Sequence, residues 1–433
     1  MALPASERTT SMFGTIALSS KTLADYEPIV GREAVAELHR LARPLRGVRV
    51  LHLSVAAFGT AVADTLSSLV PLMSDLGLPS HWQVLRPAQE FIAVNKAMYD
   101  ALAGLGARWN AEMEHVWHKY TAMNSELITE EFDFVVVHDP QPAGILLAFA
   151  EQHGRRPAGR WVWHCHLDLS EAQPDVWRIM QRYGNAYDAV VFDLAEYVRR
   201  DMDAPLITVI EPAIDPLGPK NMDLPPETVT AMLERYGLDP TRPTICQISP
   251  FDRWHDPLGL IDAYEKVKPH VPGLQLVLVA SYLAEEPEMR AYYEQVARRA
   301  EAHPDIFILS SHSSLDALGN VELNAFQRAA FATVQKSIRK GFWVTASDVL
   351  WKERPVVASP LGGIPRQVIH GETGYLARTT DQFAHRIVDL YQQPELAARL
   401  GHAGRQHVQR NFLITRYLRD YLRLFQQMVA SPS

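Results

Sequence analysis

The sequence predicts an α/β protein made of two doubly wound, Rossmann-like domains that face each other across a cleft. Short β-branched runs alternate with longer helical segments from Gly47 onward, and one segment rich in Pro and Gly interrupts this alternation. The length of 433 residues also exceeds one ordinary core, since about 150 residues per domain is usual. We therefore expect two large domains, with ligands bound at the carboxyl ends of their parallel strands.

The first series of elements forms the N-terminal domain. A strand is predicted at residues 48–53, and a helix with apolar residues at helical spacing follows at 60–76. Further apolar runs have the length of buried parallel strands. These runs are residues 81–85, 132–138, 161–166 and 189–192.

The interruption lies at residues 211–226, where periodicity stops as it does in a linker. A second series of strands is predicted at residues 244–248, 274–280, 306–309, 332–335 and 355–358. Two amphipathic helices are then expected within residues 394–428. The predicted parts are an N-terminal tail (1–24), an N-terminal domain (25–215), a C-terminal domain (227–412) and a C-terminal helix (413–433). Packing of this last helix back on the N-terminal domain is one arrangement.

Composition excludes several classes of function. The net charge of −8, from 42 basic and 50 acidic residues, provides no broad basic field for nucleic acid. Cys165 and Cys246 share no disulfide or zinc-binding spacing, so a reducing cytoplasm is expected. The sequence also lacks a secretory signal and any run of about 18 apolar residues, so no membrane span is expected.

Four polar segments lie at or just after predicted strands. They are His-Asp-Pro-Gln-Pro (138–142), Trp-His-Cys-His-Leu-Asp-Leu-Ser (163–170), Asp-Arg-Trp-His-Asp-Pro-Leu-Gly (252–259) and Val-Gln-Lys-Ser-Ile-Arg-Lys-Gly-Phe (334–342). Their order and spacing resemble the trehalose synthase branch of the retaining GT-B glycosyltransferases of family four. The resemblance extends from about residue 24 to residue 426.

This resemblance implies a GT-B fold and a retaining hexosyltransferase. The donor would be a nucleoside diphosphate sugar held mainly by the C-terminal domain, and the acceptor would be a sugar held mainly by the N-terminal domain. Cations and amide donors would stabilise the charge that develops on the leaving diphosphate. No cofactor and no metal ion are expected, and a homodimer is left open.

The resemblance also assigns candidate site residues. The catalytic candidates are His138, Gln141 and His166. The acceptor-binding candidates are Asp139, His164 and Asp168. The donor-binding candidates are Gly59, Arg253, His255, Lys336, Lys340, Asp348, Gly362 and Gly363.

Several of these positions depart from the family pattern. Pro250 and His255 stand where the family has Arg and Lys, and proline supplies neither charge nor an amide donor. Lys340 and Asp348 occupy the positions of a carboxylate pair, so Lys340 reverses one charge. The loop after the first strand keeps one glycine, Gly59. Trp343 stands where glycine is common, and His164 stands where the family has Arg.

These departures leave alternatives open. Sugar transfer is favoured, because the acceptor-side segments remain. The first alternative is a catalytically impaired member that binds a sugar or nucleotide as a sensor, scaffold or assembly partner. It is supported because Pro250, His255 and Lys340 all affect the donor end of the reaction. A retaining disaccharide phosphorylase, with free phosphate in place of the nucleotide, is a further alternative.

Overall fold

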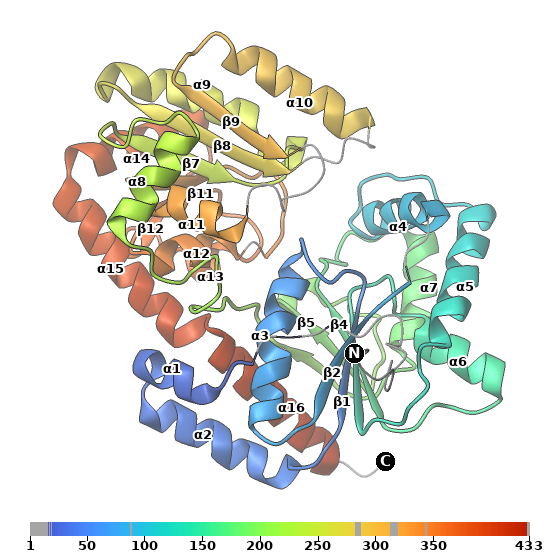
Figure 1. The fold of residues 1–433 in the computed structure, drawn as a ribbon. Helices are drawn as coiled ribbons and strands as arrows, with labels where there is room; N and C mark the ends of the chain where they lie inside the picture. The colour runs from blue at the N-terminus through green and yellow to red at the C-terminus, as the bar shows by residue number, and fades with distance from the viewer. Residues whose placement is uncertain are drawn as a thin grey trace, which may run out of the picture. The chain divides into compact units, whose positions relative to one another are not determined.

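The computed structural model describes residues 16, 18, 20–86, 89–281, 287–311, 319–342 and 344–430. The chain divides into two compact units (Figure 1). Unit 1 comprises Met1–Glu211 together with Tyr417–Ser433, and unit 2 comprises Pro212–Arg416.

Unit 1 contains a parallel six-stranded sheet in the order β2-β1-β3-β4-β5-β6. Its strands are β1 (Val50–Ser54), β2 (Ser80–Val84), β3 (Phe134–His138), β4 (Arg160–Cys165), β5 (Ala189–Phe192) and β6 (Ile207–Val209). Every residue of β1, β3 and β5 is buried, as expected for parallel strands covered on both faces.

The helices of unit 1 connect these strands and cover the sheet. They are α1 (Leu23–Val30), α2 (Arg32–Ala42), α3 (Ala61–Asp75), α4 (Gln89–Leu102), α5 (Ala111–Ser125), α6 (Ile145–His153) and α7 (Pro174–Gly184). α16 (Ile414–Ala430) joins them from the end of the chain, and its Phe425 ring stacks on Phe134 of β3 with centroids 4.2 Å apart. An aromatic stripe on α16 therefore forms part of the core of unit 1.

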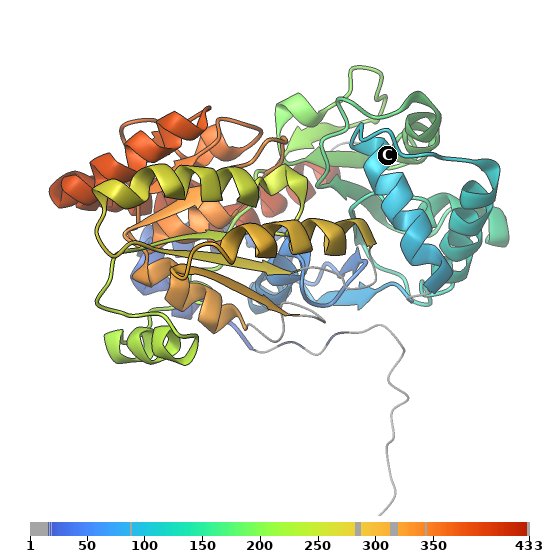
Figure 2. The same ribbon diagram turned by 90° about the horizontal axis from the view of Figure 1, so that it is seen from above.

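Unit 2 contains a second parallel sheet, in the order β12-β11-β10-β7-β8-β9. Its strands are β7 (Thr244–Ile248), β8 (Gln275–Ser281), β9 (Ile306–Ser311), β10 (Ala332–Gln335), β11 (Val356–Ala358) and β12 (Gly374–Leu376). Its helices are α8 (Pro226–Arg235), α9 (Pro257–Val267), α10 (Pro287–Ala300), α11 (Asn320–Ala329), α12 (Thr345–Trp351), α13 (Ile364–Gln367), α14 (Thr380–Gln392) and α15 (Pro394–Asn411). α9 and α10 lie side by side over the sheet (Figure 2).

Two parallel sheets with alternating helices confirm the predicted fold class. The first strand begins at Val50 and not at Val48, because Val48 N donates to Leu45 O in a preceding turn. The two helices expected near the C-terminus are α15 and α16. β6 and β12 were not predicted, since each has three residues and neither is a fully buried apolar run as the equally short β11 is.

Candidate functional site

Four histidines gather on the sheet of unit 1. His138 ends β3 and pairs in register with His164 of β4, and His166 follows β4. Side chains two residues apart in an extended segment point to the same face, which places His166 beside His164. Their ring centroids are 4.0 Å apart. His52 of β1 adds a fourth ring, 5.3 Å from that of His138.

A chain of hydrogen bonds links these rings to Asp193, which directly follows β5. His52 Nδ1 lies 2.9 Å from His138 Nε2, and His138 Nδ1 lies 3.2 Å from His166 Nε2. His166 Nδ1 and His164 Nε2 lie 2.9 and 3.3 Å from Asp193 Oδ1. A carboxylate only accepts, so both histidines donate to Asp193.

Burial sets the charge of this histidine cluster. It lowers the pKa of His52 to about 3 and that of His164 to about 4, and it lowers the pKa of His138 well below its usual value. Burial also acts to lower the pKa of His166, but nearby Asp193 raises it above its usual value. His52, His138 and His164 are therefore neutral at pH 7.

The other candidates of unit 1 lie in the loops that follow these strands. Asp139 has a left-handed backbone, with φ of 70°, and its carbonyl accepts from Trp163 Nε1 at 2.9 Å. Gln141 Oε1 is buried without a hydrogen-bond partner among the described residues. Asp168 Oδ1 accepts from Ser170 N at 2.9 Å, and Gly59 lies in the exposed loop before α3. Gln141 thus presents an acceptor that a sugar hydroxyl could satisfy.

In unit 2, three loops meet at the carboxyl ends of β7, β10 and β11, which are neighbours in the sheet. Ile338 N donates to Trp254 O at 2.7 Å, which joins the loop after β10 to the loop after β7. Gly363 N donates to Gly341 O at 3.0 Å, which joins the loops after β11 and β10. The structure therefore brings together six donor-binding candidates: Arg253, His255, Lys336, Lys340, Gly362 and Gly363.

Glycine is required where two of these loops touch. A Cβ at Gly362 would overlap the backbone of Gly341, and a Cβ at Gly363 would overlap the Phe342 ring. Gly362 also has a φ of 53°, a conformation that favours glycine. Packing against the neighbouring loop accounts for both residues.

The cationic candidates in these loops fall into two groups. Arg253 is exposed and lies 4.4 Å over the Trp254 ring, and Lys340 is also exposed. Lys336, by contrast, is buried and paired with Asp256, and His255 is buried with Nδ1 2.8 Å from Asp252 Oδ1. Exposed cations and basic side chains held by a carboxylate thus occur in the same loop cluster.

Sequence reasoning missed two contributors to this loop cluster. Arg339 lies 5.7 Å from the centre of the Trp254 ring. The Trp254 indole therefore contacts guanidinium groups from two loops, those of Arg253 and Arg339. Asp256 holds Lys336 and also caps α9, accepting from Gly259 N at 3.0 Å. Its position before a proline at the start of a helix is the signal that could have identified the cap.

Asp348, the ribose candidate, lies on α12 with a relative exposure of 1%. Asn221 Nδ2 donates to its Oδ1 at 2.9 Å, and Lys220 Nζ lies 3.0 Å from its Oδ2. Lys352, one helical turn later, donates to Asn221 Oδ1 and to the Asp348 carbonyl. The carboxylate therefore already has two partners in unit 2.

Lys352 makes a pH dependence of stability testable. Its pKa is lowered to about 7, chiefly by burial and also by Lys220 and Arg328, against the opposite effect of Asp348. An unfolded lysine keeps its proton to about pH 10.4, so unfolding takes up a proton between pH 7 and that value. Stability due to Lys352 should therefore rise with pH above 7, by up to about 1.4 kcal/mol per pH unit.

The variant Lys352→Met is expected to remove this slope in urea unfolding measured between pH 7 and 9. Lys119→Met, at a lysine whose side chain is 60% exposed, is the matched control and should retain the slope. If the free energy of unfolding had the same slope against pH in wild type and in Lys352→Met, the prediction that buried Lys352 loses its proton near neutral pH would be wrong.

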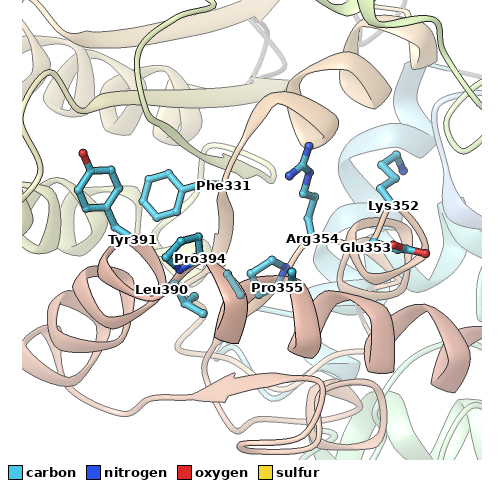
Figure 3. A pocket seen from close by; sticks show the side chains of 10 residues that line it. Phe331, Lys352, Glu353, Arg354, Pro355, Leu390, Tyr391 and Pro394 are labelled. Atoms are coloured by element: carbon cyan, nitrogen blue, oxygen red, sulfur yellow. The ribbon is translucent and has the colours of Figure 1, made fainter.

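A pocket of unit 2 lies at the opposite edge of its sheet (Figure 3). Phe331 and Pro355, which directly precede β10 and β11, line it. Figure 3 shows Phe331, Tyr391 and Pro394 grouped at one end and Lys352 at the other. Because ligands of doubly wound sheets bind at the carboxyl ends of strands, this pocket is separate from the donor-binding candidates. Trp343 lies outside the described residues.

Comparison with known proteins identifies the family. Residues 52–199 match the N-terminal domain of trehalose synthase, and residues 229–407 match the glycosyl transferases of group 1. The trehalose synthase of Rubrobacter xylanophilus is 42% identical over 94% of this chain and 97% of its own length. The chain belongs to the trehalose synthase family of glycosyltransferases. The family member from Pyrococcus horikoshii is 35% identical, over 94% of this chain and 97% of its own.

Solved structures agree on the fold of this family. The UDP-forming α,α-trehalose-phosphate synthase of Burkholderia xenovorans, in complex with glucose-6-phosphate, has a TM-score of 0.70 at 12% identity. The match covers 87% of this chain and 100% of that one. Among the described helices, none has both the length and the apolar character needed to cross a membrane.

Proposed function

We propose that this chain is a retaining hexosyltransferase that moves glucose, or a related sugar, from a nucleoside diphosphate to a sugar acceptor. The observation that carries the proposal is the 42% identity to a trehalose synthase along nearly the full length of both chains. The buried Cys165 and Cys246 form no disulfide, which favours a reducing cytoplasm as the place of action.

The donor is assigned to the three joined loops of unit 2. Negative charge develops on the diphosphate oxygen as the sugar departs, and preformed cations stabilise it. Arg253 and Lys340 are exposed at these loops, and Lys336 lies beneath them. The buried Gln335 Oε1 and Ser337 Oγ have no hydrogen-bond partner among the described residues, so a ligand here would satisfy them. The proposal places no metal ion at the diphosphate.

The acceptor and the reacting sugar are assigned to unit 1. Gln141 Oε1 would accept a hydrogen bond from a sugar hydroxyl, and His166, whose side chain is 16% exposed, is the accessible member of the histidine cluster. His138, at 1% exposure, would orient His166 through their hydrogen bond.

An impaired, binding-only member is the second candidate, and the donor loops supply the observation that favours it. Lys336 and His255 are each held by an aspartate, and Pro250 offers neither charge nor N–H. Each charge-assisted phosphate contact contributes about 1.5–3 kcal/mol, so the loss of two weakens donor binding by several orders of magnitude.

An assay of the full chain separates these candidates. The chain is incubated with glucose and each of the UDP, ADP, GDP and TDP esters of glucose, and the product is followed by proton NMR of the anomeric region. An α-linked disaccharide with release of nucleoside diphosphate is the expected result. Binding of nucleotide without product would favour the impaired member. In a parallel incubation with trehalose and phosphate, formation of glucose 1-phosphate would favour a phosphorylase.

Restoring the family's donor residues gives a sharper prediction. The combined substitutions Pro250→Arg, His255→Lys and Lys340→Glu should raise kcat/KM for the donor by about 10-fold to 100-fold, since two phosphate contacts are regained and that of Lys340 is lost, a net gain of one. The measurement is the initial rate of disaccharide formation at low donor concentration. Wild type should already form product, so activity found only in the restored variant would overturn the proposed transfer.

A further inference from the structure

We propose that His138, His164 and His166 bind one divalent transition-metal ion in unit 1, with Zn²⁺ as the best match. One ring nitrogen from each of these residues lies within 4.8 Å of the other two. Neutral imidazole is a preferred ligand of Zn²⁺ and its neighbours in the first transition row. This inference goes beyond the transfer reaction and departs from the expectation of a metal-free protein.

The distances approach those of a tetrahedral site. Zn–N bonds of about 2.0–2.1 Å place two ligand nitrogens about 3.3 Å apart. His138 Nδ1 and His166 Nε2 already lie 3.2 Å apart. The distance from the His164 nitrogen to the other two, at most 4.8 Å, has to shorten by up to about 1.5 Å to reach the same spacing.

Each of the three rings has its second nitrogen held by another group. His138 Nε2 lies 2.9 Å from His52 Nδ1, His166 Nδ1 lies 2.9 Å from Asp193 Oδ1, and His164 Nδ1 lies 2.6 Å from the Tyr421 hydroxyl. Metal-binding histidines almost always have such partners, which fix the tautomer and aim the free nitrogen at the ion. Here the partners come from β1, the loop after β5 and α16.

The surroundings suit a cation and leave it a path of entry. Asp193 supplies a negative charge, and its Oδ1 lies 3.3 Å from His164 Nε2, where it could also complete the ligand set. His164 stands at the family's arginine position, so this chain lacks a positive charge that would repel a metal ion. The side chains of His164 and Asp193 are 0% and 4% exposed, and that of His166 is 16% exposed, so an ion would enter past His166.

A metal-free hydrogen-bonded cluster is the competing explanation. When His166 is neutral, Asp193 accepts from His166 Nδ1, His166 Nε2 accepts from His138 Nδ1, and His138 Nε2 accepts from His52 Nδ1. This order leaves His52 Nε2 as a buried acceptor without a partner among the described residues. Binding of a metal ion would move the His138 proton to Nε2, where it is donated to His52, and the His164 proton to Nδ1, where it is donated to the Tyr421 hydroxyl. A second proton on His166, whose pKa Asp193 raises, would leave to solvent.

The test uses the full chain, stripped with EDTA and dialysed, and titrated with Co²⁺ and with Zn²⁺. We expect one ion per chain in calorimetry, the visible absorption of tetrahedral Co²⁺, and a rise in Tm with Zn²⁺. His164→Arg, which keeps a donor for Asp193, should abolish the Co²⁺ spectrum, and Asp193→Asn should lower Zn²⁺ affinity by about 10-fold to 100-fold.

His115→Ala, at an exposed histidine of α5, is the control and should bind both ions as wild type does. Circular dichroism checks the fold of each variant, and His166→Ala replaces His164→Arg if the latter fails to fold. Absence of the Co²⁺ spectrum in wild type, or its persistence in the folded histidine variant, would overturn the metal site in favour of the hydrogen-bonded cluster. These readouts measure metal binding and need no transfer activity, so they are separate from the test of sugar transfer. A bound ion would take the place of the hydrogen bond between His138 Nδ1 and His166 Nε2.

Discussion

Replacement of Lys336 by Met is expected to weaken binding of a nucleoside diphosphate by about 10-fold to 100-fold, because one charge-assisted phosphate contact contributes about 1.5–3 kcal/mol. Asp256→Asn should act in the opposite direction and strengthen binding by about 10-fold, since it removes the carboxylate that holds the Lys336 ammonium. The Lys336 ammonium would then bind the phosphate without sharing its charge with Asp256. These opposite effects on nucleoside diphosphate binding are expected because the donor site is proposed to lie at Lys336.

Calorimetric titration with UDP at two salt concentrations measures both effects. Asn caps helices as well as Asp does, so Asp256→Asn should keep the hydrogen bond from Gly259 N and the start of α9. Lys266→Met, in the last turn of the same helix and 52% exposed, is the matched control and should bind UDP normally. Weaker binding in Asp256→Asn would show that Asp256 itself serves the ligand, contrary to this prediction.

Removal of the Asp193 carboxylate is expected to lower the free energy of unfolding of unit 1 by about 3–5 kcal/mol, the usual cost of breaking a buried charged pair. Asp193 is 3% exposed and accepts from both His164 and His166. Burial alone would raise its pKa, but His166 and the hydrogen bonds from both histidines lower it below the usual value. Asp193→Ala leaves two buried N–H groups without an acceptor.

Urea unfolding of Asp193→Ala in the presence of EDTA isolates this effect from metal binding. Asp175→Ala is the matched control in unit 1, since the side chain of Asp175 is 83% exposed, and its cost should stay within about 1 kcal/mol. A loss below about 1 kcal/mol in Asp193→Ala would mean that water or another group replaces the carboxylate.

Local sequence pattern was sufficient for most of the fold. The runs that became β3, β4 and β7 were recognisable because a strand buried on both faces needs nearly every side chain to be apolar. His138 and His166 are in contact, and the loops that carry Arg253 and Lys340 are joined, because the carboxyl ends of neighbouring parallel strands share one edge of a sheet.

The partners of those side chains could not be found in the same way. Asp193 and His52 belong to no recognisable sequence motif. Tyr421 contacts His164 but lies 257 residues away from it in the sequence. Asp256 and Lys220 likewise became visible only as the partners of Lys336 and Asp348. Each of these pairs joins positions far apart in the chain, so spacing alone gives no signal.

The sequence by itself therefore determined the alternation of strands and helices, the parallel sheets and the trehalose synthase resemblance. Only the tertiary structure decided which cations are exposed, which are held by carboxylates, and that four histidines share one buried cluster. The reason is physical: strands and helices follow from the apolar periodicity of neighbouring residues, whereas charge state and accessibility depend on groups that approach only when the chain has folded.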